Sequence, residues 1–302
     1  MSPGSERNDD VLSITTEMVA AVGAKITGHK VGRVERLAGS VGNRDFMLFS
    51  SAGDFVLKAS SIQDLRAEAW ACQRVRQEGV TAPEIIHLDT GEGDLPVPFL
   101  LMRRLTGTPV EDSSPALRAA GERLALVHSI SLHGYGALTV TDTSAAGTSD
   151  SWAPFVADLT AGLVELEAED LLPEPLAAAA LAALTQEADH IAFDDPAVLL
   201  HGDLKLMHIF ATPEHRVGII DWGDACAGDP RLDMARLSMA GADALEAVMS
   251  GYGSQLTPEL GRTLACYRLI WNIDALTYEY RAGGDWFDAY RHGIATALAE
   301  LT

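Results

Sequence analysis

The stretch "HGDLKLMHIF" (residues 201–210), followed by "IIDWGDACAGDPRLDMARL" (residues 219–237), decides how this sequence is interpreted. Each segment belongs to an apolar run that predicts a strand, and each strand gives way to a loop that begins with an aspartate, Asp203 or Asp221. A carboxylate at such a position is exposed enough for chemistry and is held by rigid backbone on one side. We therefore expect a hairpin that carries Asp203 and Asp221 at neighbouring ends.

Phosphoryl transfer is a reaction that needs carboxylates in this arrangement. The nucleotide phosphates must be held, a metal ion must bridge them, and the acceptor hydroxyl must be aligned beside a carboxylate. Asp203 is the candidate for accepting the hydroxyl proton, and Asp221 is the candidate for holding magnesium. The alternative, that both are loop and cap residues, is weakened by Lys58 and Glu68, which stand upstream in the order that a kinase needs.

Candidates for nucleotide binding lie in the first 104 residues. Small residues in "AGSVGN" (residues 38–43) can bring the backbone close to phosphate, and a lysine on the strand "FVLKAS" (residues 55–60) can pair with phosphate and with a glutamate on the following helix. Each signal is weak by itself, because turn glycines and edge lysines are common. The residues are Gly39, Ser40, Gly42, Lys58, Glu68 and Met102.

The hydrophobic pattern changes along the chain from strand-like to helix-like. Residues 33–58 predict three short strands, and residues 61–80 predict a helix capped by Ser61. Two further strands flank the turn "DTGEGD" (residues 89–94), and we place a boundary near Arg104. Beyond it, apart from the two strand-like segments around Asp203 and Asp221, helical periodicity dominates to the end of the chain.

These segments together resemble the aminoglycoside phosphotransferase family, whose antibiotic kinases share the protein-kinase fold. "LRAEAWACQRV" (residues 65–75) and "GERLALVHSISLHGYGAL" (residues 121–138) extend the match to nearly the whole chain. The resemblance implies an α+β, bilobal fold: a small antiparallel-sheet lobe that binds nucleotide (1–104) and a larger, mainly helical lobe with the catalytic loop and the acceptor site (105–302). It further implies ATP or GTP, Mg²⁺ or Mn²⁺, and bracing roles for His201, Asp229 and Asp233.

His208 departs from the pattern of the resembled family. Most members have asparagine five residues after the catalytic aspartate, where the amide oxygen binds magnesium. Imidazole can also bind a divalent ion through a neutral ring nitrogen, although magnesium prefers oxygen. Macrolide phosphotransferases are similar to this chain in carrying histidine here. We predict that His208 is a metal ligand; the alternative is a hydrogen-bonding strut beside Asp221.

Lys205 is a second departure, because "HGDLK" is closer to the "RDLK" of protein kinases than to the usual loop of the family. Two interpretations are open. Lys205 either neutralises the charge that develops on the transferred phosphate, which makes it a catalytic candidate beside Asp203, or is a solvated loop lysine.

The resemblance also points to the last helices as the acceptor site. In "WNIDALTYEYRAGGDWFDAY" (residues 271–290), helical spacing places Trp271, Asp274 and Tyr278 on one face, with Glu279 close by. Carboxylates can hold a cationic sugar, and aromatic rings can stack on its apolar face. The alternative is that the rings pack in the core and the carboxylates face water.

Composition excludes several classes of partner. The chain has 302 residues, 47% of them hydrophobic and 22% charged, which is the balance of a globular protein. Its 43 acidic and 22 basic residues give a net charge of -21, which repels nucleic acid and anionic membrane and attracts cations. Cys72, Cys226 and Cys266 show no disulfide or metal spacing, and no signal peptide is visible, so we expect a cytoplasmic protein.

Three functions follow. The first is an ATP- or GTP-dependent kinase that phosphorylates a hydroxyl of an antibiotic, for resistance or self-protection, as a monomer or a homodimer. The second is a metabolic kinase of the same fold that acts on a small alcohol such as choline, a sugar or an amino acid. The third, motivated by His208, is a nucleotide-binding protein without catalysis. The presence of Lys58, Glu68, Asp203 and Asp221 argues against the third.

Overall fold

The computed structural model describes residues 13–37, 43–91, 93–111, 115–141, 143–212 and 216–302. Contacts divide the chain into a first unit, Met1–Thr108 with Thr212–Gly223, and a second unit, Pro109–Ala211 with Asp224–Thr302. Sequence patterns suggested one cut near Arg104, whereas residues 212–223 group with the first unit although they lie far along the chain. The phosphate-loop candidates Gly39, Ser40 and Gly42 lie outside the described residues.

The first unit is built on an antiparallel sheet that has five strands in the described part, in the order β1-β2-β3-β5-β4. The strands are β1 (Val31–Arg36), β2 (Asn43–Ser50), β3 (Gly53–Ser60), β4 (Ile85–Asp89) and β5 (Phe99–Arg103). The three strands expected over residues 33–58 and the two around the "DTGEGD" turn are thereby confirmed. β11 (Val217–Ile219) joins this unit through Ile219 N, which donates to Thr81 O at 2.9 Å.

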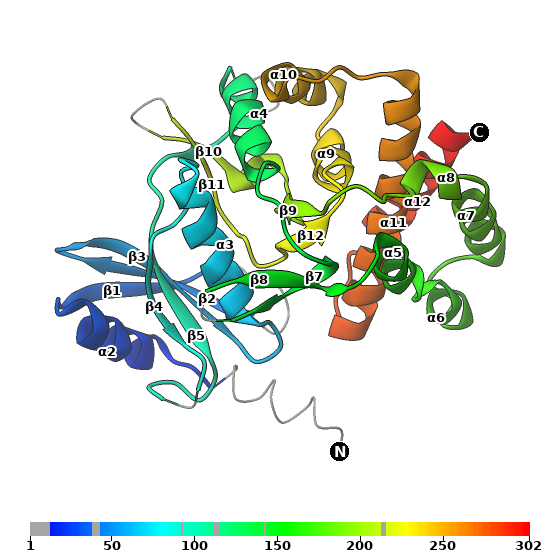
Figure 1. Cartoon of the computed structure of the whole chain (residues 1–302). Coiled ribbons are helices and arrows are strands. Elements are labelled where there is room, and N and C mark those ends of the chain that lie inside the picture. Colours follow the sequence, from blue (N-terminus) through cyan, green and yellow to red (C-terminus); the bar gives the residue numbers. More distant parts are fainter. Residues whose placement is uncertain (1–12, 38–42, 92, 112–114, 142, 213–215) are drawn as a thin grey trace. The chain divides into compact units, whose positions relative to one another are not determined.

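The two faces of this sheet are covered by different helices (Figure 1). α2 (Thr16–Thr27) packs with Phe55 and Leu57 in one buried cluster, and α3 (Leu65–Gln77) packs with Leu100 in another. Because side chains alternate along a strand, Lys58 lies on the α3 face of β3. The cap expected at Ser61 is wrong: the Ser60 hydroxyl holds the turn before the helix, and α3 begins after Asp64, whose Oδ1 accepts from Arg66 N at 3.0 Å.

The second unit is mainly helical but contains a sheet that has four strands in the described part, in the order β8-β7-β12-β9. The strands of this unit are β7 (Tyr135–Val140), β8 (Ala145–Ser149), β9 (Val198–Leu200), β10 (Ile209–Ala211) and β12 (Cys226–Gly228), with β6 (Thr108–Pro109) at the boundary between the units. The β7–β8 hairpin lies where helix was expected. The predicted hairpin is corrected in one respect: β9, the strand that leads to Asp203, pairs with β12 and not with the strand before Asp221.

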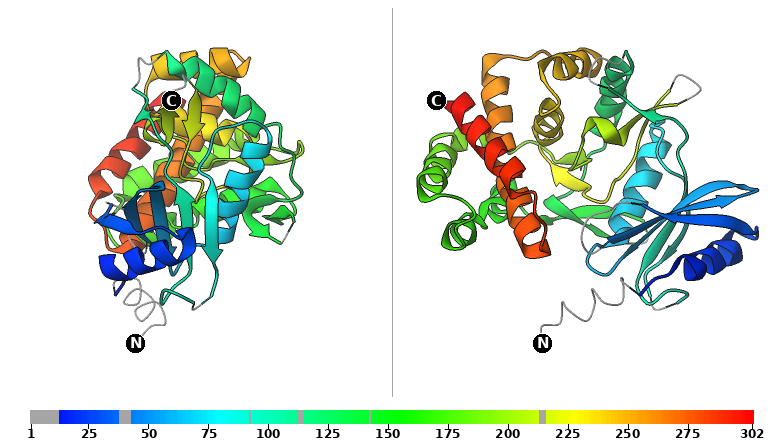
Figure 2. Two further views of the ribbon diagram at one scale, coloured as in Figure 1. Left: turned by 90° about the vertical axis from the view of Figure 1, so that its left-hand side faces the viewer. Right: turned by 180° about the vertical axis from the view of Figure 1, so that it is seen from behind.

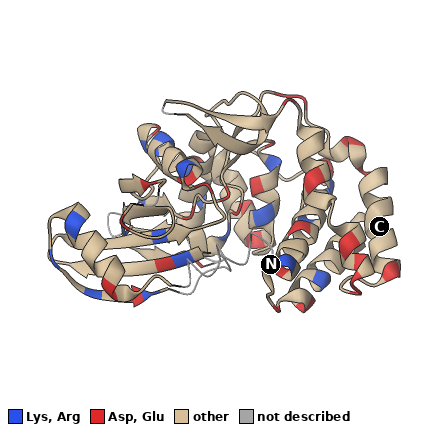
Figure 3. Cartoon of the chain, turned by 90° about the horizontal axis from the view of Figure 1, so that it is seen from below, with Lys and Arg blue, Asp and Glu red and all other residues tan. Residues whose placement is uncertain are grey.

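In the helical part of the second unit (Figure 2), α5–α9 and α12 pack against the long helix α11, whereas α4 and α10 pack against each other. The helices of this unit in the described part are α4 (Ala116–Val127), α5 (Trp152–Thr160), α6 (Leu163–Ala168), α7 (Glu174–Gln186), α8 (Ala188–Ile191), the 3-10 turn η1 (Leu206–His208), α9 (Arg231–Ser238), α10 (Ala242–Tyr252), α11 (Pro258–Ala282) and α12 (Phe287–Leu301). Figure 3 shows Asp and Glu positions recurring along the helices near the C-terminus. Within the described ranges, no helix combines the length and apolar composition that crossing a membrane requires.

Candidate active site

Lys58 is the centre of the charged cluster in the first unit. Its Nζ lies 2.9 Å from Glu68 Oε2 and 3.0 Å from Asp221 Oδ1, and its side chain is only 9% exposed. The β3 face that carries Lys58 is covered by α3, which brings Glu68 within reach. Burial disfavours the lysine charge, but Glu68 and then Asp221 outweigh it and raise the pKa of Lys58 well above its ordinary value. Lys58 is therefore a fixed positive charge.

Asp45 adds a third carboxylate to this cluster, and sequence analysis did not single it out. Asp45 stands opposite Lys58 in the β2–β3 ladder, so both side chains share one face of the sheet. Its Oδ1 is buried and has no hydrogen-bond partner among the described residues. Burial raises the pKa of Asp45, Lys58 opposes the rise, and Asp221 adds to it. The alternation of β2 was the signal in the sequence, but alternation does not tell which face of this strand lies on the side of Lys58.

Asp221 is held in a conformation that costs energy. Its φ is +64°, in the left-handed region that side chains other than glycine rarely occupy. The neighbouring Trp222 is fully buried, and its Nε1 donates to Ile219 O at 3.1 Å, which fixes the loop on both sides of the aspartate. Backbone strain at a carboxylate of this kind is a feature of functional sites.

The loop that carries Asp203 is anchored by α9 within the second unit. Asp233, fully buried, accepts from His201 N at 2.7 Å and from Gly202 N at 2.9 Å. Gly202 has φ +84°, and a Cβ there would collide with Asp224 O, so glycine is required. The bracing role expected of Asp233 agrees with these bonds.

The Asp203 carboxylate is bound at both oxygens by cations. Oδ1 accepts from Arg236 Nε at 2.7 Å, and Oδ2 accepts from Lys205 Nζ at 2.8 Å. Burial alone would favour the neutral acid, but Arg236 and then Lys205 lower the pKa of Asp203 below its ordinary value. Asp203 is therefore ionised near neutral pH, as a proton acceptor must be. Arg236 was missed by sequence analysis, although it follows Asp233 by one helical turn and so faces the same loop.

His208 ends η1 and is 5% exposed. Its Nδ1 lies 2.9 Å from the carbonyl oxygen of Asp203. Because a carbonyl only accepts, Nδ1 carries the proton of this bond, and in a neutral ring the lone pair is then on Nε2. Metal-binding histidines commonly donate their second ring nitrogen to a carbonyl in this way. This hydrogen bond fits a metal ligand, because it leaves Nε2 available. The same bond also fits the alternative role of a hydrogen-bonding strut.

A metal ion would find few ligands from the protein itself. Over the described ranges, no three His, Cys, Asp or Glu side chains gather closely enough to form a metal site. Magnesium commonly takes one or two carboxylates, with water and substrate phosphate completing its shell. The Asp221 carboxylate, 44% exposed, fits that mode.

The predicted acceptor residues lie on one stretch of α11 but in different environments. Trp271 stacks on Arg236, whose Cζ is 3.8 Å from the ring centroid. Asp274 is largely buried, and its burial, followed by the charge of Asp224, raises its pKa to about 6, with Arg281 opposing. Tyr278 is 45% exposed. This face of α11 therefore extends from the catalytic loop to the surface.

Glu279 and Met102 occupy places with structural demands of their own. Glu279 Oε1 accepts from Asp285 N at 2.9 Å and from Trp286 N at 3.2 Å, which closes the turn between α11 and α12. Met102 is 6% exposed on β5 and packs with Leu65 of α3. Their predicted roles in acceptor and nucleotide binding stay predictions.

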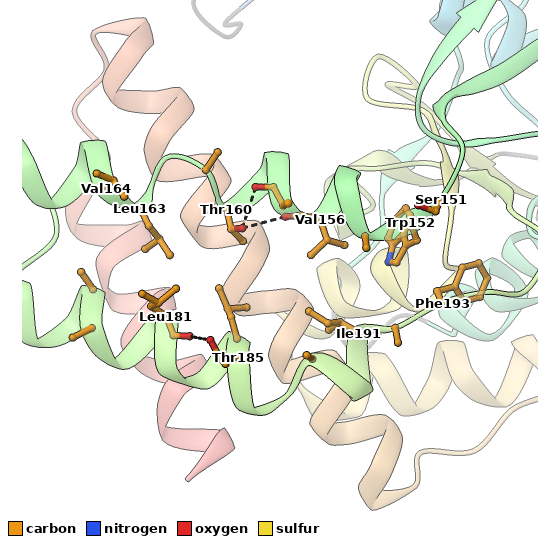
Figure 4. A pocket seen from close by; sticks show the side chains of 18 of the residues that line it. Ser151, Trp152, Val156, Thr160, Leu163, Val164, Leu181, Thr185, Ile191 and Phe193 are labelled. Carbon is orange, nitrogen blue, oxygen red and sulfur yellow. Dashed lines mark hydrogen bonds between the residues drawn. The ribbon is translucent and has the colours of Figure 1, made fainter.

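A groove of about 750 Å³ lies elsewhere in the second unit, between α5–α6 and α7–α8 (Figure 4). Its walls are mainly apolar, and the hydroxyls of Thr160 and Thr185 donate to their own helices. The residues that line it include neither Asp203 nor the α11 face. The groove is therefore separate from the loop that carries Asp203.

Comparisons with known proteins identify the family and the fold. The model of the phosphotransferase enzyme family matches residues 33–269. No curated protein sequence matches the chain. Among solved structures, aminoglycoside phosphotransferase APH(4)-Ia, in complex with ADP and hygromycin B, has a TM-score of 0.73 at 16% identity, covering 93% of this chain and 98% of its own.

Two further structures show the same fold. A fructosamine-3-kinase candidate from Thermobifida fusca gives a TM-score of 0.72 at 19% identity, with 95% of this chain and 99% of that chain covered. A choline/ethanolamine kinase family protein from Mesorhizobium loti gives 0.68 at 19% identity, with 99% and 94% covered. The α+β, protein-kinase-like fold is thus confirmed, and the family match spans most of the sequence. The chain belongs to the phosphotransferase enzyme family.

Proposed function

We propose that the chain transfers the γ-phosphoryl group of ATP or GTP to a hydroxyl of a small cationic molecule of the antibiotic class. The observation that carries this proposal is the ionised Asp203, held by Arg236 at 2.7 Å in a loop whose backbone is fixed by Asp233. A carboxylate fixed in this way can align an acceptor hydroxyl and accept its proton.

The remaining residues supply the parts that phosphoryl transfer needs. Lys58, kept charged by Glu68, would pair with nucleotide phosphates, and Gly39, Ser40 and Gly42 would bring backbone amides to them. Asp221 and His208 would hold Mg²⁺ or Mn²⁺, which neutralises phosphate charge when bound. Lys205 would move from Asp203 to the transferred phosphate, and Met102 would contact the nucleoside base.

The cationic acceptor is supported by the charge of the α11 face. Burial, and after it the charge of Asp224, raises the pKa of Asp274, and the backbone of Asp224 lies against Gly202 in the loop that holds Asp203. An ammonium group there would relieve their repulsion. Tyr278 and Glu279, farther along α11, would also contact the acceptor. Trp271, on which Arg236 packs, would form the base of the acceptor site.

A metabolic amino-alcohol kinase is the second candidate, because the same two carboxylates would suit any acceptor that combines a hydroxyl with an amine or a quaternary ammonium group. The kinases of known structure to which this chain is similar act, by their names, on both kinds of acceptor. A bulky antibiotic and a small amino alcohol differ in size, which makes the substrate panel the discriminating measurement.

The test is release of ADP or GDP with magnesium over a panel of aminoglycosides, macrolides, peptide antibiotics, nucleosides and small amino alcohols. Acceptor-dependent release that disappears in Asp203→Ala would support the kinase and name the acceptor class. Nucleotide binding without release for any acceptor, or release that Asp203→Ala retains, would contradict the proposal. Asp158→Ala, an exposed change on α5, is the matched control.

A further inference from the structure

Arg236 lies between the candidate base and the acceptor face of α11. On one side its Nε donates to Asp203 Oδ1 at 2.7 Å, and on the other its Cζ lies over the Trp271 ring, 3.8 Å from the ring centroid. Trp271 in turn meets Tyr290 of α12 edge to face, with centroids 6.0 Å apart. Helices α11 and α12 of the same unit are therefore linked to the Asp203 carboxylate through Arg236 of α9.

The two cations on Asp203 are not equivalent. The Arg236 side chain is 12% exposed, whereas that of Lys205 is 31% exposed. A buried charge that loses its partner pays a large desolvation cost, whereas an exposed lysine exchanges its partner for water or phosphate cheaply. Arginine also keeps a planar, directional donor, while lysine is a flexible point charge. The exposures thus distinguish a lasting partner of the base from an exchangeable one.

We propose that Arg236 is a positioning residue for phosphoryl transfer: it fixes the orientation of the Asp203 carboxylate, and Trp271 fixes Arg236. If Lys205 turns to the phosphate, the second Asp203 oxygen loses its bond to Lys205, and the bond from Arg236 Nε to Oδ1 remains to orient the carboxylate. We call the contacts of Arg236 with Asp203 and Trp271 the clamp. The kinetic consequence of the clamp rests on the proposed function, but the clamp itself can be measured without an acceptor.

Arginine ¹H–¹⁵N NMR tests the clamp directly. The Arg236 Nε–H resonance, assigned by its loss in Arg236→Lys, should exchange slowly with water in the wild type. It should exchange faster in Asp203→Ala, and it should lose its ring-current shift in Trp271→Leu but keep part of it in Trp271→Phe. A resonance that Asp203→Ala and Trp271→Leu both leave unchanged would overturn the clamp. This measurement stands even when no acceptor is found, in which case only the proposed function fails.

Kinetics test the consequence of the clamp. Arg236→Gln should lower kcat by roughly 10- to 100-fold while the KM for nucleotide changes by less than about twofold, because a misaligned base slows transfer without weakening nucleotide binding. Arg236→Lys should recover part of kcat. Arg268→Gln is the matched control: Arg268 is 15% exposed in the same unit and bonds to Ser238 Oγ at 2.6 Å. Equal losses of kcat in Arg236→Gln and Arg268→Gln, at equal thermal stability, would overturn the positioning role.

Discussion

Asp45 stands directly across the β2–β3 ladder from Lys58, on the face of the sheet where Lys58 meets Glu68 and Asp221. One lysine thus faces three carboxylates in the first unit. The three carboxylates repel the phosphates of a nucleotide unless a further positive charge binds together with them. The arrangement therefore predicts that nucleotide binding itself, and not only catalysis, depends on a divalent cation.

Asp45→Asn should weaken that dependence. Removing one negative charge should improve nucleotide affinity in the absence of metal by roughly fivefold, or about 1 kcal/mol, while affinity with saturating magnesium changes less. Calorimetric titration of a non-hydrolysable nucleotide with and without magnesium measures the ratio. Asp54→Asn, which removes a charge of β3 that pairs with Arg104, is the control. If Asp45→Asn left the ratio of the affinities with and without magnesium unchanged, the Asp45 charge would not repel the bound phosphates.

Asp203→Ala should lower the rate of phosphoryl transfer by about 10²- to 10⁴-fold, because the base is lost, and should leave nucleotide affinity nearly unchanged. Single-turnover transfer and nucleotide titration on the same preparation separate the two quantities. A parallel loss of transfer and nucleotide affinity would contradict the assignment of Asp203 to the acceptor.

Sequence patterns predicted the parts of the site that lie on regular elements. The pairing of Lys58 with Glu68 was predicted from the parts that phosphoryl transfer needs and from their order along the chain. The structure bears out this pairing, because α3 covers the face of β3 that carries Lys58. Asp45 could not be assigned in the same way, since alternation does not say which face of β2 meets the lysine. Arg236 required knowledge that α9 turns Asp233 toward the catalytic loop.

The errors in the predicted strands have two causes, very short strands and strands interrupted by glycine. β9 and β12 contain three residues each, too few for a hydrophobic pattern, so the partner of β9 could not be predicted. The β7–β8 hairpin was missed because its glycines break any pattern. Gly147 is needed there for a steric reason that only the fold reveals: a Cβ would collide with the backbone of Tyr135.

His208→Asn should retain transfer and lower the ratio of manganese-supported to magnesium-supported kcat/KM. Asparagine would offer an oxygen, which magnesium prefers, in place of an imidazole nitrogen. The ratio is obtained from rates at matched free metal concentrations. His133→Asn, at an exposed position of the same unit, serves as the control. An unchanged metal profile would favour the strut, in which His208 only donates to Asp203 O.

The KM for a cationic acceptor should fall as pH rises through about 6, because the pKa of Asp274 is raised to about 6 by burial and by Asp224, with Arg281 opposing. Below that pH the carboxyl is neutral and attracts an ammonium group weakly. Asp274→Asn should remove this limb of the profile and keep KM high throughout. Initial rates between pH 5 and 8 measure it, with Glu259→Gln at the exposed start of α11 as the control. If KM still fell through the same pH range in Asp274→Asn, a group other than Asp274 would be responsible for the pH dependence.

Asp233→Asn should destabilise the protein by about 2–4 kcal/mol at pH 7, because it removes a buried carboxylate that accepts from two backbone amides. Burial opposes its charge, but His128 and His201 lower the pKa of Asp233 in the folded state. A lowered pKa contributes stability above the unfolded value, and that contribution is lost as pH falls through the folded pKa. Urea unfolding should therefore show the wild-type advantage shrinking in acid. Asp158→Asn, on the surface of α5, is the control and should change stability by less than about 0.5 kcal/mol. If the difference in unfolding free energy between the wild type and Asp233→Asn did not depend on pH, the ionised carboxylate would not be its source.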